Sequence, residues 1–312
     1  MEGVLILGAL AAILVFFILP RRGVLGPSQN FAHITDPNTY NTYAADRAAQ
    51  GGTGTIANSS YSSLISLGQG NAAYSIEPAE EYITIQNQSE SPINITGWKL
   101  TNNKGNRTYY SGNQAVHYAS DEMIIPQATG YISPTGGFNL AQNVVLAPND
   151  MAIITTGSVG VQSPYKITSF KENECSGYIE ALPQYDFTPT LNYACVSPSL
   201  EPGLSNLDTA CKNFVSGISG CQTPVFGQIN RGSTDNCDNC VNGRPAPSTA
   251  CLNFIKDHFN YPGCINYHKD DPKFYSNTWR IFLAKQWEVW DKQDEVISLF
   301  DQFGKLAAYK SY

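Results

Sequence analysis

Apolar and polar residues alternate in two neighbouring segments of the chain, Tyr82–Asn87 and Ile93–Leu100, which a polar, proline-containing turn separates. Two shorter apolar runs, Val144–Leu146 and Ala152–Ile154, lie on either side of a Pro-Asn-Asp turn. Alternation with a period of two is typical of strands that bury one face. We therefore predict that the first two segments form a β-hairpin and that the second two add a further pair of strands.

The remainder of the chain is less regular. At its C-terminal end, Thr278–Ala284 and Asp294–Tyr312 predict three more strands, with Gly304 at the turn between the last two. The stretch Ser62–Ile76 is compatible both with a first strand and with a disordered linker, and the sequence leaves the two open. Residues 158–276 contain all eight cysteines and show no clear strand series.

Trp98 is the most prominent apolar residue of the alternating segments. A tryptophan at such a position packs between two sheets and dominates the core around it. Its expected neighbours in that core are Ile83, Ile85, Ile95 and Leu100.

Three stretches of the predicted strands carry a resemblance to a known family: EYITIQNQSESPINITGWKL from Glu81, LAPNDMAII from Leu146 and EVISLFDQFGKLAAYKSY from Glu295. In this order they resemble the lamin-tail domain, and the Gly97-Trp98 element is their most specific part. The resemblance implies a mainly β fold, an immunoglobulin-like β-sandwich made of residues 75–157 and 277–312. It also implies that residues 158–276 are an insertion between two strands of that sandwich.

The N-terminal segment is apolar without interruption over residues 4–19 and is followed by a proline and two arginines. Its length is close to the lower limit for a helix that crosses a hydrocarbon layer about 30 Å thick. It lacks the basic start and the small-residue cleavage site of a signal peptide. We therefore expect residues 1–22 to form an uncleaved transmembrane helix and residues 23–74, which are small and polar, to form a stalk.

Two opposing signals bear on the side of the membrane that the rest of the chain occupies. Arg21 and Arg22, directly after the span, favour a cytoplasmic location under the positive-inside rule. An even set of cysteines in loop-rich sequence favours disulfides and an oxidising compartment. We give the cysteines more weight and expect an extracytoplasmic location, at the cell surface or on the periplasmic side, while a cytoplasmic one stays open. The order of anchor, stalk, sandwich and insertion also resembles that of membrane-anchored bacterial proteins.

The cysteines are the main chemical feature of the insertion, at positions Cys175, Cys195, Cys211, Cys221, Cys237, Cys240, Cys251 and Cys264. Cys211 and Cys251 occupy the same place in a repeated phrase, TACKNFV and TACLNFI. Apolar residues of each phrase recur at helical spacing, and each phrase begins with a natural N-cap. The candidate caps are Asp208 or Thr209 and Ser248 or Thr249. Each phrase therefore predicts a short helix with its cysteine in the first turn, on the buried face.

This placement restricts disulfide pairing. If the first helix continues toward Cys221, that residue lies about 15 Å from Cys211, whereas a disulfide needs Cα atoms within about 7 Å. We therefore expect that Cys211 does not pair with Cys221 and that Cys251 does not pair with Cys264. Each helix cysteine then pairs with the other repeat or with one of the four remaining cysteines, and the connectivity stays open.

Zinc is the alternative to disulfides. Cys237-x2-Cys240 followed by Cys264-x3-His268 offers four ligands of the right kinds, although the spacer between the pairs is longer than usual. Against zinc, the two helix cysteines lie on apolar faces and four further cysteines would be left over. We expect disulfides and no cofactor, and we keep zinc as the alternative.

The other candidate residues have simpler explanations. His258 extends the apolar face of the second helix and is predicted to be a packing residue. Asp270 and Asp271 fit no calcium-binding loop and are expected in a solvated turn. Trp287 and Trp290 either form an exposed interaction patch or belong to the core or edge of the sandwich.

Composition narrows the function. The net charge of -7 and the absence of any run of Lys or Arg argue against a nucleic-acid partner. The chain has no nucleophile elbow, phosphate loop, zinc-protease helix or dinucleotide fingerprint. We therefore expect a non-enzymatic, membrane-anchored cell-envelope protein that acts as an interaction, adhesion or structural module, with an envelope protein or a surface glycan as its partner. The alternatives are a membrane-tethered zinc- or thiol-dependent enzyme or enzyme partner, and a surface filament subunit.

Overall fold

The computed structural model describes residues 56–134, 138–160, 163–228 and 236–312. The chain divides into two units, residues 1–31 and 32–312, and every described residue lies in the second. The predicted transmembrane helix and most of the predicted stalk therefore lie outside the described residues. Within the described ranges no helix has both the length and the apolar character needed to cross a membrane.

The largest element is a seven-stranded sheet. Its strands, in spatial order, are β1 (Ile65–Gly68), β2 (Tyr82–Asn87), β11 (Met151–Thr155), β16 (Tyr275–Phe282), β12 (Phe170–Asn173), β8 (Ala128–Thr129) and β9 (Ala141–Gln142). Strands β11 and β16 are parallel, with Ile153 opposite Arg280, whereas β2 is antiparallel to both of its neighbours. Segments distant in sequence therefore meet at the centre of this sheet.

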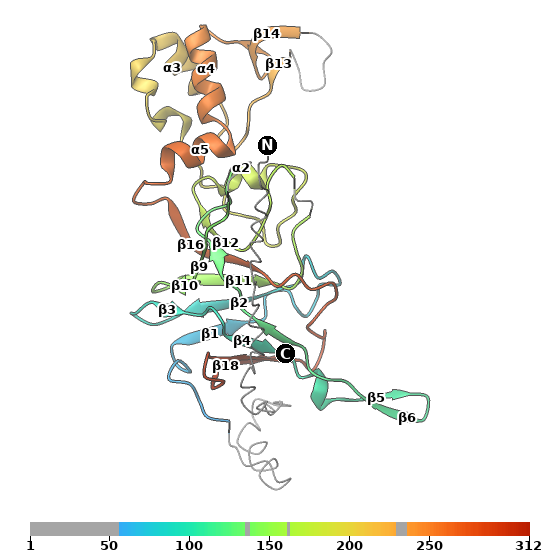
Figure 1. Cartoon of the computed structure of the whole chain (residues 1–312). Helices are drawn as coiled ribbons and strands as arrows, with labels where there is room; N and C mark the ends of the chain where they lie inside the picture. The colour runs from blue at the N-terminus through green and yellow to red at the C-terminus, as the bar shows by residue number, and fades with distance from the viewer. Residues whose placement is uncertain (1–55, 135–137, 161–162, 229–235) are drawn as a thin grey trace, which may run out of the picture. The chain divides into compact units, whose positions relative to one another are not determined.

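A second sheet has four antiparallel strands. They are β18 (Leu306–Ser311), β17 (Val296–Phe300), β4 (Lys99–Thr101) and β7 (Glu122–Ile124). The shorter paired strands are β3 (Ile93–Asn94) with β10 (Val145–Leu146), and β5 (Thr108–Ser111) with β6 (Gln114–His117). A three-stranded sheet in the insertion contains β13 (Phe226–Gln228), β14 (Asn236–Val241) and β15 (Arg244–Pro245). The prediction of a mainly β fold is confirmed (Figure 1).

One hydrophobic core joins the seven-stranded and four-stranded sheets, which we together call the body. The core takes alternate residues from β2, β11 and β16 of the first sheet and from β4, β17 and β18 of the second. Trp98 is fully buried in it, together with its four expected neighbours. The Trp98 indole Nε1 donates a hydrogen bond of 2.7 Å to Gln302 Oε1, so its polar edge is also satisfied.

The predicted hairpin between the first two alternating segments is wrong. Strand β2 pairs with β1 and β11, whereas β3 pairs with β10. The buried side chain of Asn87 holds the intervening turn, because its amide nitrogen donates to the carbonyl oxygens of Ser91 (2.8 Å) and Leu146 (2.9 Å). The alternation indicates which face of each strand is buried, but it does not indicate which strand is its neighbour in the sheet.

The other strand predictions fare better. Strands β10 and β11 form in the second pair of apolar runs, and β16, β17 and β18 form at the C-terminal end, with Gly304 at φ 73° in the turn before β18. Strand β1 resolves the open choice for Ser62–Ile76 in favour of a strand. Residues 56–74, which we had assigned to the stalk, therefore belong in part to the folded body.

The insertion contributes strand β12 to the seven-stranded sheet. Other residues of the insertion form two smaller apolar cores. Strand β12 lies within residues 158–276 yet pairs with β16, and the buried Glu172 carboxylate accepts a 2.5 Å hydrogen bond from Arg280 Nε. One small core packs α2 (Ser176–Glu180) and α5 (Tyr261–His268) against the end of the sheet. The other packs α3 (Thr209–Val215), α4 (Thr249–His258) and β14. Within the described residues there are also three 3₁₀ turns: Lys104–Asn106, Pro198–Leu200 and Leu204–Asn206.

Candidate functional site

All eight cysteines are paired in disulfides and none is free. The pairs are Cys175–Cys264, Cys195–Cys221, Cys211–Cys251 and Cys237–Cys240. The two repeats are joined to each other through Cys211 and Cys251, with Cα atoms 5.5 Å apart. The expectation that these two cysteines do not pair with Cys221 and Cys264 is confirmed.

The repeated phrase forms the two helices that the sequence predicts. Asp208 caps α3 and Ser248 caps α4, and in each case the side chain accepts a hydrogen bond from the backbone N–H of the cysteine. Both cysteine side chains are fully buried, and α3 and α4 lie side by side (Figure 1). Helix α3 ends at Val215, earlier than we had assumed, so the excluded pairing follows from the fold and not from helix length alone.

The predicted zinc ligands are not assembled. Cys237 and Cys240 are bonded to each other, and Cys264 is bonded to Cys175. Zinc binds the cysteine thiolate, and a sulfur in a disulfide has no thiolate to offer. The fourth member of that set, His268, does lie in a polar cluster, but with carboxylates as its partners.

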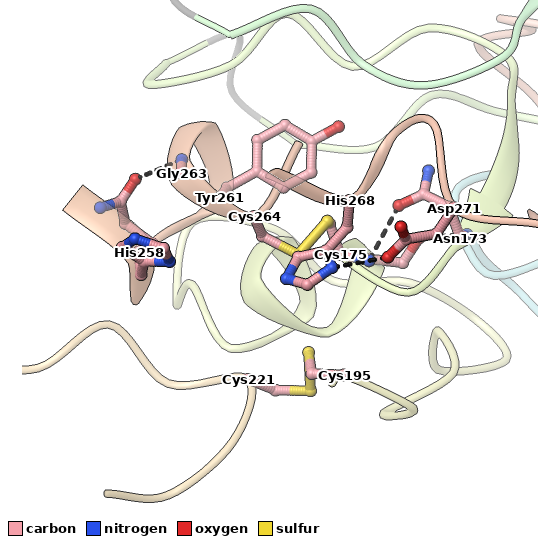
Figure 2. The surroundings of a disulfide bond; sticks show 12 residues. Asn173, Cys175, Cys195, Cys221, His258, Tyr261, Gly263, Cys264, His268 and Asp271 are labelled. Atoms are coloured by element: carbon pink, nitrogen blue, oxygen red, sulfur yellow. Dashed lines mark hydrogen bonds and ion pairs between the residues drawn. A yellow bond between two sulfur atoms is a disulfide. The ribbon is translucent and has the colours of Figure 1, made fainter. Parts of the chain in front are cut away.

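A buried chain of histidines and carboxylates runs through the insertion. Glu201 Oε2 lies 3.0 Å from His258 Nδ1 and 3.3 Å from His268 Nε2. The other nitrogen of His268, Nδ1, lies 2.8 Å from Asp271 Oδ2. His268, the last residue of α5, therefore bridges two carboxylates, and Figure 2 shows its contact with Asp271. Only Asp271 reaches the surface, with its side chain 48% exposed.

Charge and burial determine the protonation states of His268 and Glu201. The hydrogen bond to Glu201 is the largest influence on the pKa of His268, and together with Asp271 it outweighs burial and raises the pKa from 6.5 to about 9. Burial acts to raise the pKa of Glu201, but hydrogen bonds and charge from the two histidines outweigh it and hold the pKa below 4.5. At neutral pH His268 is therefore a cation that lies between the carboxyl groups of Glu201 and Asp271.

His258 has more than the packing role that its position predicted. Its ring is stacked on Phe254, with ring centroids 4.0 Å apart, and on Tyr267, with ring centroids 3.7 Å apart. The prediction of a packing residue is confirmed, and the bond to Glu201 adds a polar role. This bond ties α4 to the segment 57 residues earlier in the chain.

Glu174 also lies near His268 and Asp271. Its carboxylate Oε2 is buried and makes no hydrogen bond with any described residue. Burial, and then the charge of Asp271, raise the pKa of Glu174 above 4.5, against a smaller opposing effect of His268 and Lys273. One ligand atom each from Glu174, His268 and Asp271 lies within 4.8 Å of the others.

Trp287 and Trp290 do not form an exposed pair. Trp290 is buried in the body core, and only Trp287 is exposed, at 49%, beneath the ammonium group of Lys285. Of the two alternatives that the sequence left open, the core role therefore applies to Trp290. An exposed patch that requires both rings is not available.

Two members of the cluster around His268, Glu174 and Glu201, were not predicted from the sequence, and neither was the contact between Asp271 and His268. We had predicted Asp271 in a solvated turn, and its side chain is indeed half exposed, yet it also binds His268. Helix α5 was also missed, although Asn260 followed by Pro262 is a readable start signal: the Asn260 side chain accepts from Gly263 N. No local signal links Glu201 to two histidines that lie 57 and 67 residues away.

Models of known protein families do not match this chain, and no curated protein is similar to it.

Proposed function

We propose that the chain is a membrane-anchored, extracytoplasmic protein of the cell envelope that acts as a non-enzymatic interaction or structural module. The carrying observation is that all eight cysteines are in disulfides, three of which join segments 26 to 89 residues apart. Disulfides of this kind form and persist in oxidising compartments. The apolar run over residues 4–19 would supply the anchor.

In this proposal the body is a lamin-tail-like, immunoglobulin-like sandwich, and the insertion is the part presented to a partner. The two sheets that share the core of Trp98 support the first half. The disulfides support the role of the insertion, because they hold loop-rich sequence in one arrangement. A surface that is ordered in advance loses less conformational entropy when it binds a partner. The partner would be another envelope protein or a surface glycan.

Location and orientation are tested on intact cells. A membrane-impermeant maleimide is added to one sample of cells directly and to a second sample after treatment with an impermeant reductant. The mass of the extracted chain is then measured by mass spectrometry. We expect no label without reductant and labelling of the disulfide cysteines after it, and external protease should remove residues 56–312 from the membrane. Labelling that requires lysis of the cells, or free thiols before reduction, would contradict the proposal.

A further inference from the structure

We propose that Glu174, His268 and Asp271 form a binding site for one divalent transition-metal cation, of which Zn²⁺ is the best fit. The site is independent of the proposed function and uses a different ligand set from the cysteine-based zinc site that the sequence suggested. Its three donor atoms come from the end of β12, from the end of α5 and from the turn that follows α5.

The spacing of the donor atoms suits a small cation. They lie within 4.8 Å of one another. A tetrahedral ion with bonds of about 2.1 Å holds its ligands about 3.4 Å apart, so a movement of about 1.4 Å or less in the Glu174 side chain would close the site. One imidazole and two carboxylates favour zinc or manganese over calcium or magnesium, which prefer oxygen ligands alone.

The two nitrogens of His268 face two different carboxylates, so one of them can keep its hydrogen bond while the other exchanges its proton for a metal. Metal-bound histidines almost always donate their second ring N–H to a carboxylate, a backbone carbonyl or water, which fixes the ring and its tautomer. Here Nδ1 faces Asp271 at 2.8 Å, while Nε2 lies 3.3 Å from Glu201. A cation at Nδ1 would displace the proton that this nitrogen donates to Asp271, and it would leave Nε2–H to donate to Glu201, which His258 holds in turn.

Glu174 provides an independent observation. Its Oε2 atom is buried and has no hydrogen-bond partner among the described residues, although a buried carboxylate oxygen without a partner is costly. A cation between Glu174 and Asp271 would satisfy this oxygen and neutralise two carboxylates that raise each other's energy. Asp271 is half exposed, so the site is open to solvent on that side.

The Cys175–Cys264 disulfide positions the site. Cys175 is the residue directly after Glu174, and Cys264 lies one helical turn before His268 on α5. The bond therefore fixes the two segments that carry these ligands, with Cα atoms 5.7 Å apart at the disulfide (Figure 2). In this arrangement Cys264 supports the metal site as part of its scaffold, and zinc does not require its sulfur.

The test is a calorimetric titration of ZnCl2 into the full chain, extracted in detergent, freed of metal with a chelator and with its disulfides intact. We expect one zinc per chain. Glu174→Gln and Asp271→Asn should each weaken binding at least about tenfold, and Glu201→Gln, which acts through His268, roughly 10- to 100-fold. Asp270→Asn is the matched control, since it removes an exposed carboxylate one residue from Asp271 and should change the affinity less than about twofold.

Each variant is first checked for folding by tryptophan fluorescence and far-UV circular dichroism. Co²⁺ provides a second readout, because its visible spectrum reports the number and kind of its ligands and should change in Glu174→Gln and not in Asp270→Asn. The absence of stoichiometric zinc binding would overturn the proposal. Binding of equal strength in the wild type, Glu174→Gln and Asp271→Asn would overturn it as well, because the metal would then lie elsewhere.

Discussion

In the body, the buried carboxylates of Glu81 and Glu295 accept hydrogen bonds from backbone N–H groups, including those of Val289 and Asn103, whereas in the insertion Glu201 lies between two histidines. This difference in hydrogen-bond partners reverses the direction in which the pKa of the buried carboxyl group shifts. Burial raises the pKa of both body carboxylates above 4.5, while the histidines hold that of Glu201 below it. Backbone dipoles stabilise a buried anion less than paired cations do.

The two regions also differ in what holds them folded. The body has one large core drawn from two sheets and contains no cysteine, while the insertion has two smaller cores and every disulfide. Small apolar cores stabilise a fold only weakly and are commonly supplemented by disulfides. We infer that the body is stable by packing, and that the insertion depends on covalent cross-links.

Spectroscopy can separate the two regions. All four tryptophans, Trp98, Trp279, Trp287 and Trp290, lie outside residues 158–276, so tryptophan fluorescence reports the body. The α-helices within the described residues, α2 to α5, all lie in the insertion, so helical circular dichroism reports that region. The predictions below use this pair of signals.

Reduction of the disulfides should have the largest effect. Loops of 89, 40 and 26 residues are closed by the long-range pairs, and each closure stabilises the fold by about 4 kcal/mol in the chain-entropy account. Their combined loss is comparable to the whole stability of a typical domain, which is about 5–15 kcal/mol. We expect the helical signal to disappear on reduction while the tryptophan signal remains. Simultaneous loss of both signals would contradict the inference that the body stays folded without the disulfides of the insertion.

Trp98→Ala should destabilise the body by about 3–5 kcal/mol, because it leaves a cavity in the fully buried core. In denaturant titrations the fluorescence midpoint should fall, while the helical signal should hold to higher denaturant as long as the disulfides are intact. Trp287→Ala is the matched control: this ring is 49% exposed, and its removal should change the stability by no more than about 0.5 kcal/mol. Similar losses in the two variants would be inconsistent with a core centred on Trp98.

Two pairs of cysteine substitutions compare a long disulfide loop with a short one. Cys211→Ser with Cys251→Ser opens a loop of 40 residues and should lower the stability of the helical signal by about 4 kcal/mol, with α3 and α4 separating. Cys237→Ser with Cys240→Ser opens a loop of three residues within β14 and should lower it by about 2 kcal/mol or less. Equal losses would show that local strain, and not loop length, decides the effect.

The smallest effect is a dependence of body stability on pH. A carboxyl whose pKa is raised by folding stabilises the folded state at low pH, and this contribution is lost as the pH rises from about 4.5 through the folded pKa. Because the pKa values of Glu81 and Glu295 are raised, we expect the free energy of unfolding measured by fluorescence to decline over this interval. Glu81→Gln should make the decline shallower, and Glu90→Gln, an exposed control, should leave it unchanged. A decline of the same slope in Glu81→Gln would contradict this assignment.

The features that the sequence predicted well depend on local signals. The caps Asp208 and Ser248, the buried cysteines that follow them and the core position of Trp98 each follow from neighbouring residues or from periodicity. Strand pairing did not follow from local signals, because the alternation in β2 and β3 fits several partner strands. The actual pairing depends on the buried Asn87, which bonds to a residue of β10. The Glu201 contacts depend on tertiary structure alone, since they join residues 57 and 67 positions apart.

The central claim, that long-range disulfides hold the insertion together, is tested most directly by disulfide mapping. Protein isolated from its native source without reductant is alkylated, digested, and analysed by mass spectrometry. We expect that no cysteine is alkylated, and that cross-linked peptides are found for the pairs Cys175–Cys264, Cys195–Cys221, Cys211–Cys251 and Cys237–Cys240. Alkylation of Cys211 or Cys251 without reductant would contradict it.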